Sequence, residues 1–287
     1  MYHHYSQEDL RAYCRTSIES FEIWAKRLIH EQFSARYGQD YAQRQIAPDE
    51  YVFNSETRKH IASMLANNPG RFSKPVDTLF LDQIISVICN PKWYHSLFKD
   101  ALDHAYPTGV ETARAYLSRI IPVRNRLSHS NPISVRQAEQ AICYSHDFID
   151  GLKAYYKEKG EEQMWNVPRI IRITDSQGNT FENPSEKNGP QSSFWLSQKF
   201  YCGDTYSVSV EIDSSFDPTD YDIIWKKEYL TEIEECRNST QFTIQFSTQD
   251  IQQGFSITCY VISHKSWHRF SFYDCSIALI MDVFPPL

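Results

Sequence analysis

The feature that most constrains the fold is a change in hydrophobic period near Gly160. Before it, apolar residues recur at steps of three and four, which places them on one face of a helix. After about Pro168, β-branched and aromatic residues alternate with polar ones, which is the period of a half-buried strand. The change predicts an α + β multidomain protein, with an all-α helical bundle over residues 1–160 and a β-sandwich over residues 167–287.

Start and stop signals divide the first 160 residues into separate helices. The acidic turn at residues 6–9 opens a long helix that Gly38 ends. A loop follows, and Ser55 caps a short helix beyond it. Pro75 begins a strongly apolar helix that Asn90-Pro91 breaks, and a further helix is expected over residues 93–105.

Two capping-box patterns precede the last two helices of this domain, at Thr108–Glu111 and at Ser134–Gln137. The first is expected to start a helix that runs to Ile121, after which Pro122 perturbs the backbone. The second starts a long helix that Gly160 ends. The residues between the two helices therefore form a short, constrained segment.

The alternating part predicts about seven short strands, which is typical of a β-sandwich of roughly 120 residues. Its segments 221–225 and 255–261 resemble the paired core strands of an immunoglobulin-like domain. Valines occupy the 206–212 strand, where that resemblance would place a partner cysteine. An immunoglobulin-like sandwich without a disulfide is therefore expected.

Cysteine usage and the lack of long apolar runs point to a cytoplasmic protein. The seven cysteines are odd in number and form no CxxC pair, so we expect free, mostly buried thiols. Residues 1–5 lack the basic start and apolar stretch of a secretory signal. Apolar runs such as residues 84–88 are too short to cross a bilayer, so no membrane partner is expected.

The net charge of −7 is unevenly distributed. Residues 1–160 hold 20 Lys and Arg against 18 Asp and Glu, a balance of +2, whereas residues 161–287 hold 9 against 18, a balance of −9. A polyanion is expected to prefer the N-terminal part. A balance of +2 is nearly neutral, however, and does not by itself identify a nucleic-acid-binding protein.

The segment Arg124-Asn125-Arg126-Leu127-Ser128-His129 carries the clearest chemical signal. It is the one place in the chain where an arginine precedes a histidine by five to seven positions. A guanidinium can bind a phosphodiester, and an imidazole can move its protons without a metal. Residues five apart on a regular helix point about 140° away from each other. One copy therefore converges poorly unless the helix ends inside the segment, whereas two copies related by a two-fold axis can share one site.

This RNxxxH segment, set before a long closing helix, resembles the HEPN superfamily over residues 1–158 and most closely over residues 109–156. The resemblance implies a homodimeric endoribonuclease that needs neither a metal nor another cofactor. Arg124 would bind the scissile phosphate, His129 would transfer protons at the ribose 2′-hydroxyl or the leaving oxygen, and Asn125 would orient the histidine or the phosphate. The products would be a 2′,3′-cyclic phosphate and a 5′-hydroxyl, and the activity would belong to phage defence or a toxin-type system.

Further contacts follow from this hypothesis. Three arginines are expected to contact RNA phosphates or to be ordinary surface charges: Arg119, Arg126 and Arg136. Asn131 stands where some HEPN toxins carry a tyrosine that a partner enzyme modifies, so control by that route is not expected. The acidic β-domain is expected to be a sensor, a regulator or a docking module for a protein partner or inhibitor. The aspartates at positions 213–222 are interpreted as a solvated loop, and no metal site is expected.

Two other functions stay open at this point. The helical domain could be a non-catalytic dimerisation module in an adaptor protein whose β-domain binds another protein. It could also bind RNA without cleaving it. Neither alternative requires Arg124 and His129 to act on the same phosphate.

Overall fold

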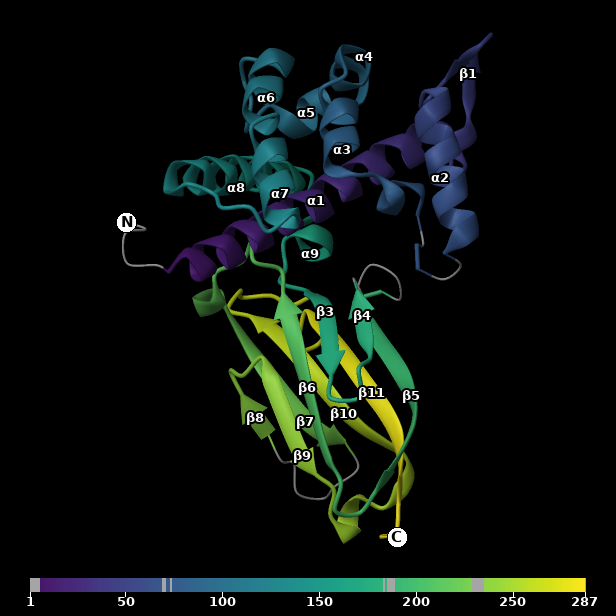
Figure 1. The fold of residues 1–287 in the computed structure, drawn as a ribbon, viewed down its shortest axis with the longest axis vertical. Coiled ribbons are helices and arrows are strands. Elements are labelled where there is room, and N and C mark those ends of the chain that lie inside the picture. Colours follow the sequence, from purple (N-terminus) through teal and green to yellow (C-terminus); the bar gives the residue numbers. More distant parts are fainter. Residues whose placement is uncertain are drawn as a thin grey trace. The chain divides into compact units, whose positions relative to one another are not determined.

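The computed structural model describes residues 6–68, 71–72, 74–182, 184, 189–228 and 235–286. The chain divides into two compact units, Met1–Lys159 and Gly160–Leu287. The first unit is built mainly of helices and the second mainly of two sheets (Figure 1). The chain is therefore an α + β protein. Residues 160–167, between the two predicted domains, contain the short helix α9 (Glu162–Trp165).

The α-helices of the first unit are α1 (Gln7–Tyr37), α2 (Ser55–Asn67), α3 (Leu81–Ile88), α4 (Pro91–Trp93), α5 (Lys99–Leu102), α6 (Val110–Leu117), α7 (Ile120–Ser128) and α8 (Val135–Glu158). A π-helical turn, Tyr94–Phe98, joins α4 to α5, and a 3₁₀ turn, Pro75–Thr78, precedes α3. The loop expected over residues 38–54 contains a small hairpin of β1 (Gln45–Ala47) and β2 (Glu50–Tyr51).

Helices α1 and α8 form the centre of this unit. The apolar face of α1 meets α8 through aromatic pairs, with the Phe21 and Phe148 ring centroids 4.8 Å apart. Helix α1 also contacts α3 and α7, so its buried face organises the rest of the bundle. At Gly151 of α8, an added Cβ would lie only 2.7 Å from the Cβ of Ala105, so this close approach requires glycine.

Several predicted helix boundaries are confirmed. Ser6 and Asp9 form a reciprocal capping box at the start of α1, and Gly38 ends the helix with a φ of 83°. Ser134 and Gln137 form the predicted box at the start of α8. Helix α8 itself ends two residues before Gly160.

Several local predictions are wrong. Pro75 begins a 3₁₀ turn, and the strongly apolar helix α3 starts only at Leu81. The helix expected over residues 93–105 is divided by the π-helical turn and ends at Leu102. The cap of α2 is Asn54 rather than Ser55, because the Asn54 side chain accepts the backbone N–H of Thr57. The expected box at residues 108–111 does not form, since Gly109 is the cap and makes no side-chain contact. The helix expected to run to Ile121 breaks after Leu117. Pro122 lies in the first turn of α7, where backbone N–H groups have no acceptor within the helix, so the N–H that proline lacks costs no helical hydrogen bond.

The strands of the second unit are β3 (Ile170–Asp175), β4 (Thr180–Glu182), β5 (Gln191–Tyr201), β6 (Thr205–Ile212), β7 (Tyr221–Glu228), β8 (Glu235–Arg237), β9 (Gln241–Gln245), β10 (Gln252–Ser263) and β11 (Cys275–Phe284). One sheet has the order β4-β3-β6-β9 and the other β5-β11-β10-β7-β8. All neighbours are antiparallel except β5 and β11, which run parallel.

The two sheets enclose one core. Side chains from both contribute to it, including Ile173, Val208, Trp225 and Ile257. The Trp225 ring stacks on Phe242 of the other sheet, with centroids 5.5 Å apart. All seven cysteines are free thiols, and four of them are buried, which confirms the expectation of a unit without disulfides.

The sequence predicts about seven strands, whereas the described residues of this unit form nine. The pattern did not predict β5, the longest strand after β10. Its central residues Phe194, Trp195 and Leu196 are three consecutive apolar side chains and hide the alternation. Leu196 is buried in the core, whereas Trp195 is 68% exposed. Within the residues that the structure describes, no helix is both long and apolar enough to span a membrane.

Candidate functional site

The predicted catalytic segment forms the last two turns of α7 and the residue that ends it. His129 is the C-terminal cap, with its backbone N–H bonded to the Asn125 carbonyl at 3.2 Å. Ser130 then takes a left-handed conformation, with a φ of 55°. The Asn131 N–H reaches back to the Arg126 carbonyl at 2.8 Å, which closes the helix with a Schellman motif. The helix therefore ends inside the segment.

Arg124 is half-buried and is held against α1. Its Nε lies 4.0 Å from Oε1 of Glu22, and its NH1 donates a hydrogen bond of 3.4 Å to the Asn125 side chain. Glu22 belongs to the central helix α1, so the ion pair joins the guanidinium to that helix. Asn125 therefore contacts the arginine, rather than the histidine that the sequence suggested as one of its partners.

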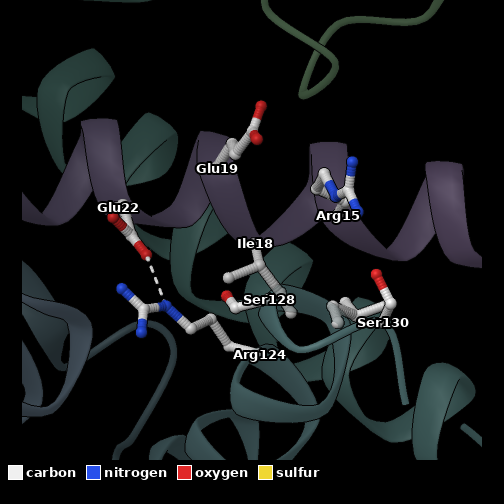
Figure 2. A pocket seen from close by; sticks show the side chains of 8 residues that line it. Arg15, Ile18, Glu19, Glu22, Arg124, Ser128 and Ser130 are labelled. Atoms are coloured by element: carbon white, nitrogen blue, oxygen red, sulfur yellow. Dashed lines mark ion pairs between the residues drawn. The ribbon is translucent and has the colours of Figure 1, made fainter. Parts of the chain in front are cut away.

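An open pocket of about 520 Å³ surrounds the Arg124 side chain. Figure 2 shows its lining, with α1 on one side and the end of α7 on the other. The residues that line it are Arg15, Ile18, Glu19, Glu22, Arg124, Leu127, Ser128 and Ser130. Two guanidiniums and two hydroxyls can bind an anion here, but two carboxylates balance the charge of the arginines.

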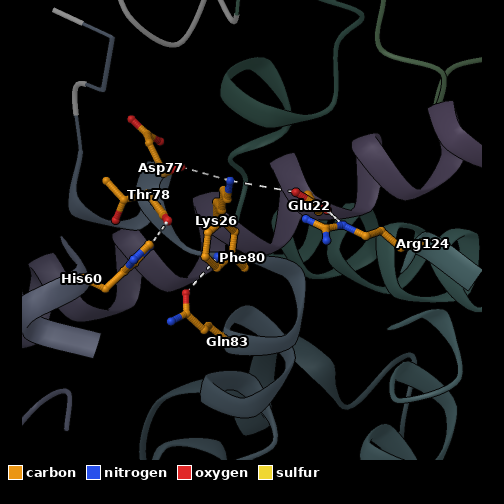
Figure 3. Close-up of polar contacts among 8 residues, drawn as sticks. All are labelled: Glu22, Lys26, His60, Asp77, Thr78, Phe80, Gln83 and Arg124. Atoms are coloured by element: carbon orange, nitrogen blue, oxygen red, sulfur yellow. Dashed lines mark hydrogen bonds and ion pairs between the residues drawn. The ribbon is translucent and has the colours of Figure 1, made fainter. Parts of the chain in front are cut away.

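The carboxylate of Glu22 belongs to a chain of charged groups that continues along α1. The Nζ atom of Lys26 lies 4.0 Å from Oε2 of Glu22 and donates a hydrogen bond of 3.3 Å to the backbone carbonyl of Asp77 (Figure 3). Burial raises the pKa of Glu22 above its usual value of 4.5, and the nearby charges of Lys26 and Arg124 oppose that rise. An anion that binds Arg124 must therefore compete with a partly desolvated carboxylate.

His129 and Asn125 lie outside this pocket. Both are exposed, and neither lines the cavity around Arg124. Within the described residues, the imidazole of His129 makes no hydrogen bond or ion pair. The structure thus places Arg124 and His129 on the same short segment without bringing them to one point in a single copy of the chain.

The three arginines expected to contact RNA are exposed and differ in their contacts. Arg119 NH1 donates to the Tyr144 hydroxyl at 3.0 Å, and Tyr144 stacks parallel on Tyr116 with centroids 4.8 Å apart. Arg126 NH1 donates to the Pro132 carbonyl at 3.2 Å. Arg136 projects from the first turn of α8. None of the three lines the Arg124 pocket.

No pattern in the sequence predicts that Arg15 and Glu22 lie against the segment, since they precede it by about a hundred residues. The sequence of α1 does carry a signal for a contact of this kind. Glu22 and Lys26 directly follow Phe21 and Ala25, which belong to the apolar stripe, so both charges border the buried face. Charged residues at the border of such a stripe often pair with a neighbouring helix, but the pattern does not say which one.

No family model matches the chain. No curated protein matches it either. Among the described residues, no three His, Cys, Asp or Glu side chains gather closely enough to hold a metal ion. What is established is therefore an α + β protein whose helical unit holds an arginine in a mixed-charge pocket beside an exposed histidine.

Proposed function

We propose that this chain is a homodimeric, metal-independent endoribonuclease of the HEPN type. The single observation that carries the proposal is the arrangement at the end of α7. Arg124 lines an open pocket of about 520 Å³, while His129 caps the helix end outside that pocket, five residues further on. The segment also lies directly before the long closing helix α8, as the resemblance requires.

In the proposed reaction, the ribose 2′-hydroxyl attacks the adjacent phosphorus and the bond to the 5′-oxygen breaks. The neutral imidazole of one His129 takes the proton of the 2′-hydroxyl. The imidazolium of His129 in a second copy gives a proton to the leaving 5′-oxygen. Arg124 stabilises the negative charge that builds on the phosphate oxygens, and Asn125 orients its guanidinium. The products are a 2′,3′-cyclic phosphate and a 5′-hydroxyl.

The requirement for two copies comes from geometry. The exposed His129 does not line the pocket of its own chain, so a phosphate on Arg124 needs a histidine from elsewhere. A two-fold axis beside the end of α7 supplies it, because each copy then presents His129 to its neighbour. The active protein is therefore proposed to be a homodimer joined through the helical unit.

The second unit is proposed to be an immunoglobulin-like regulatory or sensing domain. Its strand orders β3-β6-β9 and β11-β10-β7 correspond to the A-B-E and G-F-C orders of that fold. Its acidity makes RNA a poor partner for it, and a protein partner or inhibitor a better one. We place the whole protein in the cytoplasm, in phage defence or a toxin-type system.

The test is incubation of the purified full chain with total RNA in EDTA, followed by end-group analysis. We expect cyclic-phosphate ends with the wild type, and a loss of roughly 10²–10⁴-fold in rate for Arg124→Ala and for His129→Ala. Arg36→Ala and His104→Ala are matched controls, since they remove the same side chains elsewhere in the helical unit and should cleave normally. Equal behaviour of all five proteins would overturn the proposal.

A non-catalytic adaptor is the second candidate, and one observation favours it. Glu22 already neutralises Arg124, so the pocket can be a structural ion pair rather than a phosphate site. In that case Arg124→Ala should lower the stability of the helical unit, and neither the wild type nor the variant should cleave RNA. Dimerisation without RNA cleavage in EDTA would support the adaptor.

A further inference from the structure

One face of α1 runs along the end of α7. Arg11, Arg15 and Glu22 recur on α1 at steps of four and seven, close to one and two helical turns, so they lie on the same side of the helix. The two outer residues contact the neighbouring segment, since Arg11 donates a hydrogen bond to the Asn131 carbonyl and Glu22 pairs with Arg124. Arg15 lies between them and lines the same pocket as Arg124.

Arg15 differs from the other charged residues of this pocket in what it contacts. Glu22 pairs with Arg124 and Lys26, and Glu19 also has an interaction partner. Arg15 is exposed, and among the residues that the structure describes its guanidinium makes no hydrogen bond or ion pair. When Lys26 is counted, three cations face two carboxylates, so one positive charge is left over. An anion that enters the pocket therefore displaces no protein carboxylate when it binds Arg15.

The pocket is long enough for more than one anionic group. Figure 2 shows the ion pair of Arg124 with Glu22 at one end of it. Arg15 and Ser130 lie at the other end, and Ser128 lies between the two ends. Arg15 and Glu22 are seven residues apart on α1, which is about 10 Å along the helix. A single phosphate is smaller than this distance, so the two ends suit two phosphates of one strand.

We propose that Arg15 binds a phosphate next to the scissile one, with the hydroxyls of Ser128 and Ser130 as further donors. This inference rests on the proposed function, because it takes Arg124 to hold the phosphate that is cleaved. It defines the substrate as a strand with at least two phosphates, rather than a dinucleoside monophosphate. The three arginines that the sequence suggested as RNA contacts lie outside the pocket, whereas Arg15 lines it.

The test is cleavage, by the full chain, of a dinucleoside monophosphate with and without an added phosphate at its 5′ or its 3′ end. In the wild type, the added phosphate at one of these ends should raise kcat/KM about tenfold or more, as expected for a charge-assisted contact. In Arg15→Gln this gain should fall to about twofold or less. Arg36→Gln is the matched control and should keep the gain, since Arg36 is an exposed arginine of α1 outside the pocket. Glutamine is a good helix former, so neither change should disturb α1.

A second measurement reports binding alone. A single-stranded DNA oligonucleotide lacks the 2′-hydroxyl that the proposed reaction uses, so it binds without being cleaved. The dependence of log K on log salt concentration should be less steep for Arg15→Gln than for the wild type, by about 0.7 in slope, which is the usual contribution of one phosphate contact. Arg36→Gln should keep the wild-type slope.

The outcomes separate this inference from the proposed function. Cleavage of RNA with no gain from the added phosphate, or with the same gain in Arg15→Gln, overturns the inference and leaves the nuclease intact. Equal salt slopes for Arg15→Gln and the wild type overturn it as well, whether or not RNA is cleaved. A reduced slope for Arg15→Gln without any cleavage of RNA supports the phosphate site at Arg15 and counts against the nuclease.

Discussion

The two ends of the Arg124–His129 segment are held in opposite ways. Arg124 is half-buried, faces α1 and contacts Glu22 and Asn125. His129 closes the helix through its backbone and leaves its imidazole exposed. Under the proposed function, one copy of the chain preorganises the anion-binding end of the site and leaves the proton-transfer end to meet another surface.

The largest expected effect tests whether the two ends act across copies. Arg124→Ala and His129→Ala are each expected to be inactive alone, but a mixture that exchanges subunits forms pairs with one intact end from each chain. The mixed pair keeps one Arg124 and one of the two imidazoles that the proposed reaction uses. Its cleavage rate should therefore rise roughly a hundredfold over that of His129→Ala and stay below that of the wild type. The measurement is the rate of RNA cleavage after co-refolding the two variants. No recovery in a mixture proven to contain mixed dimers would mean that both groups act within one chain.

The second prediction concerns stability. Arg124→Ala removes a partner of a mostly buried carboxylate and should lower the free energy of unfolding by about 1–2 kcal/mol. His129→Ala truncates an exposed side chain and should change it by less than about 0.5 kcal/mol. Urea unfolding followed by far-UV circular dichroism measures both values. Equal losses would show that the two ends are not held differently.

The third and smallest effect is a pH dependence at the buried end. The pKa of Glu22 is raised by burial, so the folded state keeps its proton to higher pH than the unfolded chain does. The charged form is therefore disfavoured by folding, and stability falls as pH rises from about the usual value of 4.5 through the raised value. Glu22→Gln, which resembles the protonated form, should lose this dependence.

The measurement is the difference in unfolding free energy between Glu22→Gln and the wild type across that range. We expect the variant to gain relative to the wild type as pH rises and then to reach a plateau. A difference that stays constant with pH would show that Arg124 and Lys26 balance the cost of burying Glu22, and a change of opposite sign would show that they outweigh it. The control variant His129→Gln changes the exposed end of the segment, so it should leave the pH dependence that Glu22 causes unchanged.

Local signals in the sequence predicted much of the helical unit. Side chains three residues apart made the capping boxes of α1 and α8, and Gly38 supplied the left-handed ending of α1. The expected helix to Ile121 was wrong because Pro122 fits a first helical turn as well as a break. Strand β5 was not predicted, because Trp195 is apolar yet faces solvent, and no local pattern reveals this.

The two hydrophobic periods, many of the helix ends and the spacing of Arg124 and His129 can be read from the sequence alone, since these depend on neighbours along the chain. The contact of Glu22 with Arg124, the position of His129 outside their pocket and the pairing of β5 with β11 follow only from the folded chain. These facts depend on helix packing and strand register, which are set by the burial of whole faces rather than by any short run of residues.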